Sequence, residues 1–237
     1  MLPLKLVAIG LFLAGLTHAE EPDVRLYTEH YPPFSMETEA GISGINTELL
    51  LKAFEQLGLE VQVFVEPWAR AQAWSLQFDN GCLFSAARTT EREPMYLWAG
   101  PLSVERISLF SLAEDDILLA SLMDAEQYRI GGQQRDYYTQ WMVDQGLEVD
   151  AMSGDGSNVE RLVRGRIDLW IAGHIGGPFM AASEGAEVRP AYIADEGLEL
   201  WLACNPALSS DLVQRLDAAI ADLVSDGTLN AIKDRYQ

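Results

Sequence analysis

The sequence predicts an α/β fold built from mostly parallel sheets flanked by helices. Strand-like and helical segments alternate along the first third of the chain, and a second alternation begins near residue 128. Parallel neighbours in a sheet need crossover connections, which the helical segments provide. No sequence repeat and no linker rich in Pro, Gly or Ser separates the two units. Two units without a linker indicate two lobes joined through crossing strands.

The first unit reads as strand, helix, strand, helix and strand. A β-type run covers 24–28, and the Pro-Pro pair at 32–33 must lie in a loop because proline cannot donate to a strand ladder. Asn46 and Thr47 are typical of a helix start, and Gly58 is typical of a helix end. The unit continues with a strand over 61–65, a helix over 68–76 and a strand over 82–86.

The second unit repeats this order with fewer signals. Gly146 and Gly165 are placed to end helices, and Ser157 with Asn158 is placed to cap one. The pair at 226–227, Asp-Gly, splits the C-terminal helical stretch in two. The predicted elements are a strand over 128–130, helices over 136–144 and 157–164, strands over 167–172 and 198–203, and helices over 212–224 and 229–236.

The N-terminal segment 1–19 predicts a cleaved secretory signal peptide. Lys5 precedes an apolar run over 6–16, and small residues surround the expected cleavage point after Ala19. A membrane-spanning helix is the alternative, but this run is too short to cross a hydrocarbon core of roughly 30 Å. Position 20 is Glu rather than Cys, so no lipid anchor is expected. The segment predicts a soluble, exported protein.

The charge balance excludes whole classes of partner. The chain carries 16 Lys and Arg against 36 Asp and Glu, a formal charge of -20. This balance repels phosphate backbones and anionic lipids, so neither nucleic-acid binding nor a polybasic membrane contact is expected. With 49% hydrophobic residues, the composition is that of a folded protein.

Cys82 and Cys204 are the two cysteines of the chain. An even count in an oxidising compartment permits one disulfide, whereas apolar neighbours equally suit two buried thiols. Spacing alone does not decide between these alternatives. Two cysteines and three histidines match no metal-site pattern, and no cofactor is expected.

Six short motifs follow one another along the chain: YPPFS at 31–35, GINTELL at 44–50, EPWARA at 66–71, ARTTER at 87–92, WAGP at 98–101 and DGTL at 226–229. In their order and spacing they resemble the family 3 periplasmic solute-binding proteins. The resemblance implies a type II periplasmic binding protein fold, with lobe 1 over 20–106 and 195–237 and lobe 2 over 107–194, closing on a small ligand. It also implies that the strands of Cys82 and Cys204 are neighbours, which favours the disulfide.

Arg92 lies where the resemblance places an arginine that clamps a ligand carboxylate. A guanidinium offers paired donors to a carboxylate and stays charged. The alternative is a surface arginine paired with an adjacent glutamate. Tyr31 and Trp68 align with aromatic walls, although a tryptophan more often packs in a core. The predicted ligand-binding set is Tyr31, Trp68, Arg70, Ser85, Arg88, Arg92, Gln134, Arg135 and Gly173.

Lobe 2 carries two further features. Gln133, Gln134 and Arg135 precede a helix, whose first amides suit either an anion or plain solvated capping. Gly173 stands where the amino-acid binders carry an acidic residue for the ligand ammonium, and Ala87 stands where they often carry a hydroxyl. An unpaired, desolvated ammonium is costly, so Gly173 argues against a standard α-amino acid. The alternative is that a neighbouring carboxylate such as Asp155 pairs with the ammonium.

The sequence thus predicts a periplasmic binding protein, monomeric, that captures a small carboxylate-containing ligand for a membrane permease. A sensory module that reports to a membrane receptor is one alternative. A dehydratase-like enzyme is another, since such an enzyme also resembles this family, with Glu29, His30 and His174 as its cleft acids or bases. No catalytic triad, metal pattern or phosphate loop is present, so a non-enzymatic role is expected.

Overall fold

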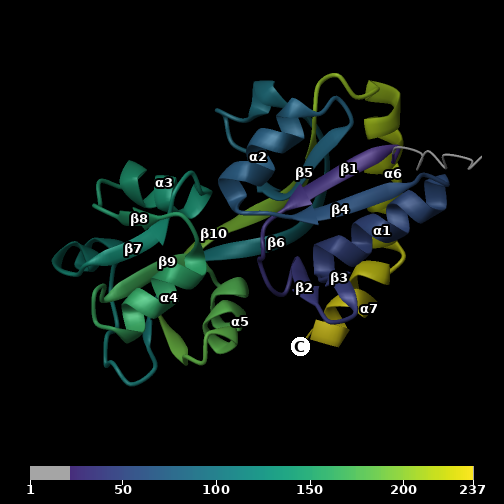
Figure 1. Ribbon diagram of the computed structural model, residues 1–237. Coiled ribbons are helices and arrows are strands. Elements are labelled where there is room, and N and C mark those ends of the chain that lie inside the picture. The colour runs from purple at the N-terminus through teal and green to yellow at the C-terminus, as the bar shows by residue number, and fades with distance from the viewer. Residues whose placement is uncertain (1–21, 237) are drawn as a thin grey trace, which may run out of the picture.

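The computed structural model describes residues 22–236, apart from the side chain of Asp155, so the predicted signal peptide lies outside the described residues. One mixed sheet of eight strands runs through the protein (Figure 1). β1 pairs in parallel with β4 and β5, and β7 pairs in parallel with β8 and β9, as the alternating pattern predicts. The strand order is β4 (Val61–Val65), β1 (Val24–Thr28), β5 (Gly81–Ala87), β10 (Val188–Cys204), β6 (Leu97–Leu112), β9 (Leu169–Gly173), β7 (Ile130–Gln133) and β8 (Asp150–Met152).

Helices gather around the two ends of this sheet, and the long strands β6 and β10 connect them (Figure 1). We call the end with β1, β4 and β5 lobe 1, and the end with β7, β8 and β9 lobe 2. Lobe 1 holds α1 (Ile45–Leu57), α2 (Trp68–Gln77), α6 (Ser210–Ser225), α7 (Thr228–Lys233) and the hairpin of β2 (Met36–Thr38) and β3 (Gly41–Ser43); lobe 2 holds α3 (Tyr137–Asp144), α4 (Asp155–Val163) and α5 (Gly176–Ser183). Three short 3-10 helices complete the fold: η1 (Glu93–Met95), η2 (Leu122–Gln127) and η3 (Asp234–Tyr236).

The crossing strands pair with each other along most of their length. β6 and β10 are antiparallel, with Glu105 opposite Leu198 at the centre. All seven residues of β5, beside them in lobe 1, are buried, which is typical of a sheet covered on both faces. The two lobes therefore share a continuous sheet rather than a flexible linker.

Local signals set several boundaries as predicted. α1 ends at Gly58, whose φ of 67° is the left-handed conformation that glycine adopts at low cost. α3 begins at Tyr137, one residue after its predicted start, because Asp136 is its N-cap and accepts hydrogen bonds from the amides of Tyr137 and Tyr138. β1 and β4 have the predicted bounds.

The structure corrects two boundaries in lobe 2. α4 begins at Asp155, so Asn158 lies inside the helix, where its buried Nδ2 donates to the carbonyl of Gly132 at 2.8 Å. β7 runs through Gly131 and Gly132 instead of ending there. A Cβ at Gly132 would lie 2.3 Å from Thr139 Oγ1, so close packing by α3 explains a glycine within this strand.

The disulfide between Cys82 and Cys204 is confirmed. The two residues are register partners on β5 and β10, and their sulfurs are bonded at 2.09 Å. Both side chains are fully buried. The bond ties the last crossing strand to the centre of lobe 1. Within residues 22–236, none of the helices has the length and apolar character needed to cross a membrane.

Candidate functional site

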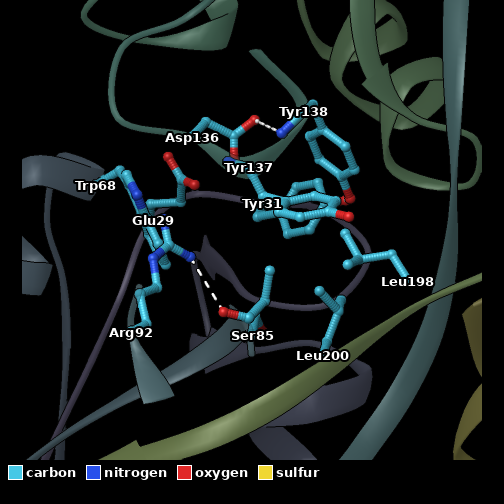
Figure 2. Close-up of a pocket in the computed structure, with 11 residues that line it drawn as sticks. Glu29, Tyr31, Trp68, Ser85, Arg92, Asp136, Tyr137, Tyr138, Leu198 and Leu200 are labelled. Carbon is cyan, nitrogen blue, oxygen red and sulfur yellow. Dashed lines mark hydrogen bonds between the residues drawn. The ribbon is translucent and has the colours of Figure 1, made fainter. Parts of the chain in front are cut away.

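A small cavity of about 20 Å³ lies where the two lobes meet (Figure 2). Its volume suffices for about one water molecule, so the lobes are closed over it. In Figure 2, Glu29 and Arg92 lie near Trp68, and the rings of Tyr31 and Tyr138 lie next to one another. The lining residues are Glu29, Tyr31, Trp68, Ser85, Ala87 and Arg92 from lobe 1, Asp136, Tyr137 and Tyr138 from lobe 2, and Leu198 and Leu200 from β10.

Direct hydrogen bonds hold the lobes together around this cavity. Two of them end on one acceptor, the backbone carbonyl of Arg135, so a single peptide of lobe 2 docks on two lobe 1 side chains. The bonds run from Trp68 Nε1 to Arg135 O at 3.0 Å, from Arg92 Nη2 to Arg135 O at 3.0 Å, from Gln133 Nε2 to Glu29 Oε2 at 2.6 Å, and between the hydroxyls of Tyr31 and Tyr138 at 2.7 Å.

Arg92 provides the positive charge of the cavity. Its side chain is only 8% exposed, and its guanidinium carbon lies 5.3 Å from the ring centre of Trp68. Nη1 donates to the carbonyl of Ala87 at 3.2 Å. Burial lowers the pKa of Arg92, while the nearby Asp136 charge opposes that change. The guanidinium has more N–H groups than its two carbonyl contacts use, so it retains donors for an anionic group.

Asp136 provides a negative charge from lobe 2. Its Oδ1 accepts from the amide of Tyr137 at 2.7 Å, and its Oδ2 accepts from the amide of Tyr138 at 3.2 Å. Burial raises the pKa of Asp136 to about 6, against the lowering effects of Arg92 and of the two amides. The carboxyl group is therefore mostly ionised at pH 7.

Glu29 adds a second carboxylate at the carboxyl end of β1. Its Oε2 accepts from Gln133, whose side chain is 2% exposed at the end of β7. The carboxyl ends of parallel strands are the usual edge for ligand sites in α/β sheets. Glu29 thus faces lobe 2 from the edge of lobe 1 that this rule favours.

Two residues beside the cavity have a left-handed backbone. Ser85 has φ 58° and Arg135 has φ 61°, which side-chain-bearing residues rarely adopt. Asn46 supports Ser85 with a hydrogen bond of 3.0 Å between their side chains. Strained backbone conformations occur preferentially at functional sites. Here one such residue lies on the lobe 1 side of the cavity and the other on the lobe 2 side.

Gly173 borders the cleft at a crowded position. A Cβ there would lie 2.3 Å from the Tyr31 hydroxyl and 2.7 Å from Glu105 Oε2. Glu105 is 1% exposed, and its carboxylate accepts from the amides of Ile175 and Gly176. Burial raises the pKa of Glu105, against these hydrogen bonds. The space in which a side chain of residue 173 would lie is therefore already filled.

Replacing Gly173 with alanine is expected to destabilise the protein by about 1–3 kcal/mol, because the methyl group must displace buried, hydrogen-bonded groups of Tyr31 and Glu105. Denaturant unfolding measures this loss. Gly154→Ala is the control for the added methyl group, since its backbone is extended and nothing lies within 4 Å of the added Cβ. Gly154 is the N-cap of α4, so this variant should lose only the smaller difference between glycine and alanine at a helix cap. Equal stability of the two variants would contradict this packing argument.

The structure brings together four members of the predicted ligand-binding set and leaves others apart from the cavity. Tyr31, Trp68, Ser85 and Arg92 line it, and Gly173 lies behind Tyr31. Ligand contact by any of these residues stays a prediction.

The exposed members of the set contact protein groups instead. Arg70 pairs with Glu66 at 2.9 Å, Arg88 pairs with Glu93 at 2.6 Å, and Gln134 donates to a backbone carbonyl. Arg135 contributes its carbonyl, while its side chain is exposed.

A wider groove of about 830 Å³ continues outward from the cavity. Arg92, Asp136 and Tyr137 line both the cavity and the groove. Arg88 and Arg135 line the groove but not the cavity. Its other walls come largely from α2 and α3, with neutral polar side chains such as those of Gln72, Thr89, Thr90, Thr139 and Gln140. A ligand larger than the cavity would extend in this direction.

Several lining residues of the cavity are not predicted from the sequence. Asp136 is the first residue of a predicted helix, where an aspartate is explained by helix capping alone. Leu198 and Leu200 read only as strand residues. Asp136 and Glu29 line the cavity with carboxylates that position 173 does not supply. The expectation of a ligand without an ammonium stays a prediction.

No group of three or more His, Cys, Asp or Glu side chains is placed to hold a metal ion among the residues that the structure describes. Of the two histidines proposed as cleft acids or bases, His30 is exposed and His174 contacts Ser108 at 3.1 Å. Burial lowers the pKa of His174. Neither histidine lines the cavity.

Comparisons with known proteins agree with this architecture. The sequence profile of the bacterial extracellular solute-binding proteins, family 3, matches residues 25–237. The L-cystine-binding protein TcyJ of Escherichia coli K12 is 22% identical over 211 residues, which are 87% of this chain and 79% of TcyJ.

Solved structures confirm the predicted two-lobed type II fold. A histidine kinase sensor domain with similarity to periplasmic binding proteins has a TM-score of 0.82 at 15% identity, covering 90% of this chain and 95% of that domain. An ancestral arginine-binding protein bound to arginine has a TM-score of 0.79 at 19% identity, covering 90% and 97%. With a matching profile over nearly its whole length, this chain belongs to the bacterial extracellular solute-binding proteins, family 3.

Proposed function

We propose that this protein captures one small ligand between its lobes, with Arg92 as the anchor. The observation that carries the proposal is a buried guanidinium, whose carbon lies over the ring of Trp68, at the junction of two lobes. A buried charge is costly unless it is paired, and two backbone carbonyls are weaker partners than a carboxylate. An anionic group on the ligand, such as a carboxylate, would complete the environment of Arg92.

Capture requires the lobes to open, because a cavity of about 20 Å³ excludes any organic ligand. β6 and β10 are the paired strands that join the lobes, so a bend along them is the natural hinge. The direct bonds between Tyr31 and Tyr138 and between Glu29 and Gln133 would open, and the ligand would take up part of their hydrogen bonding. The aromatic rings would then supply apolar contact area.

The relatives of this chain suggest which ligands to test and which membrane partner to expect. TcyJ is named as a binding protein for L-cystine, and the ancestral structure holds arginine, so small amino-acid-like carboxylates are the first ligands to test. We propose that the protein acts in the periplasm and delivers its ligand to a membrane transporter.

A thermal-shift screen with calorimetric confirmation tests this function. The panel contains amino acids, other carboxylates, polyamines and sugar acids. A true ligand at a hundredfold excess over its dissociation constant adds about 2.7 kcal/mol to the free energy of unfolding. The function would be wrong if no compound raised the melting temperature. Steady turnover of prephenate or arogenate would point instead to the enzymatic alternative.

A further inference from the structure

Glu105 is a buried carboxylate that does not line the interlobe cavity. It lies at the middle of the crossing strand β6, opposite Leu198 of β10, and is 1% exposed. Its Oε1 accepts from the amide of Arg106 at 2.8 Å and from that of Ile175 at 2.9 Å, and its Oε2 accepts from the amide of Gly176 at 3.0 Å. Ile175 and Gly176 form the start of α5, so the carboxylate is fixed to lobe 2.

The Tyr31 hydroxyl of lobe 1 bonds to the same carboxylate and to lobe 2. It forms a hydrogen bond with Glu105 and lies 2.7 Å from the Tyr138 hydroxyl of α3. Burial raises the pKa of Tyr31 well above its usual value, as do the nearby Tyr138 and Glu105 groups, so its hydroxyl keeps its proton. Because amides already donate to Glu105, the carboxylate accepts a hydrogen bond from Tyr31, and Tyr138 in turn donates to Tyr31. A directed hydrogen-bond chain therefore links α3, Tyr31 and the hinge strand.

Two glycines of lobe 2 allow Tyr31 to come this close to the hinge. A Cβ at Gly176 would lie 2.5 Å from Tyr31 Cε2, and a Cβ at Gly173 would lie 2.3 Å from the Tyr31 hydroxyl oxygen. The Tyr31 ring also contacts Phe34 of lobe 1, with the ring centres 5.1 Å apart. Lobe 2 therefore accommodates one side chain of lobe 1, with Glu105 beside its hydroxyl.

We propose that Glu105 is a positioning residue for lobe closure: held by the start of α5, it receives the Tyr31 hydroxyl as the lobes close and presents it to Tyr138. The inference rests on the proposed function in one respect, that the lobes open. Opening moves Tyr31 away from α3 and from the start of α5, so it breaks both hydroxyl bonds at once. A preformed acceptor lowers the entropy cost of making these bonds again. Glu105 thereby sets the balance between the open and the closed arrangement without lining the cavity.

The reactivity of a cysteine in the cavity tests this role without a ligand. Ser85 lines the cavity and is 8% exposed, so a Ser85→Cys thiol reacts with iodoacetamide when the lobes open. In this background, Glu105→Gln should raise the reaction rate about tenfold, because a carboxamide of the same shape cannot accept at both oxygens and a bond to a charged acceptor is lost. Glu199→Gln removes an exposed carboxylate from the other crossing strand and should leave the rate unchanged.

Tyr31→Phe separates a role through Tyr31 from plain capping of α5. This variant removes the hydroxyl alone and should also raise the rate about tenfold. If Glu105 acts through Tyr31, adding Glu105→Gln to Tyr31→Phe raises the rate no further, whereas capping alone predicts effects that multiply. Ser75→Cys, fully buried in α2 away from the cavity, reports unfolding and should react far more slowly than Ser85→Cys.

An unchanged rate in Glu105→Gln, or independent effects of the two substitutions, would overturn the role of Glu105. Equal rates at positions 75 and 85 would overturn it as well, because the cavity would then open only on unfolding. Should Glu105→Gln not fold, Tyr31→Phe decides, since an unchanged rate there would show that the hydroxyl bonds do not hold the lobes closed. The assay contains no ligand, so a negative ligand screen with a raised rate here would reject the proposed function and leave the role of Glu105 standing.

Discussion

Replacing Arg92 with alanine is expected to abolish ligand binding. The substitution removes the guanidinium that would pair with the anionic group of the ligand and leaves that group desolvated in the closed cleft. Losing one partner of a buried charged pair costs about 3 kcal/mol or more, which is an affinity loss above about a hundredfold. Isothermal titration with a ligand from the screen measures this loss.

Two further variants serve as controls for Arg92→Ala. Arg164→Ala also removes one arginine, but Arg164 is exposed and pairs with Glu160 within one helix, so binding should not change. Arg92→Lys keeps the charge and loses the planar pair of donors, so it should retain part of the affinity. Unchanged binding by Arg92→Ala would show that the ligand lies elsewhere.

Removing the disulfide with Cys82→Ala and Cys204→Ala is expected to have the largest effect on stability. The bond closes a loop with a sequence separation of 122 residues. Restricting the unfolded chain over such a loop contributes about 4–5 kcal/mol. For a protein of this size, the loss corresponds to a decrease in melting temperature of about 10–20 °C.

Redox conditions provide the control for the disulfide. The wild type in the presence of a reductant should fall to the melting temperature of the double variant, which itself should not respond to the reductant. Should the variant melt at the wild-type temperature under oxidising conditions, the bond would have no role in stability.

Much of the fold is predictable because its signals are local. The β-type run of β1, the Gly58 end of α1 and the Asp-Gly pair before α7 each act within a few residues. Elements without local signals were not predicted. α5 begins with Gly-Gly-Pro, which reads as a loop, and β10 extends ten residues ahead of its predicted start because it pairs with β6.

The residues of the candidate site also differ in how far the sequence predicts them. Arg92, Trp68 and Tyr31 lie in recognisable sequence motifs, and all three line one cavity in the structure. Asp136 has no motif, and only the closure of lobe 2 on lobe 1 brings it near Arg92. The absence of a carboxylate at Gly173 does not decide whether the ligand carries an ammonium, because other elements also supply carboxylates to the cavity.

An experimental structure with a ligand from the screen bound tests the central claim most directly. The account predicts that the anionic group of the ligand lies about 2.7–2.9 Å from the Arg92 guanidinium, against the ring of Trp68, with the Tyr31–Tyr138 bond opened. A ligand bound outside the space between the lobes, or one that leaves Arg92 in contact with the carbonyls of Ala87 and Arg135 alone, would contradict the account.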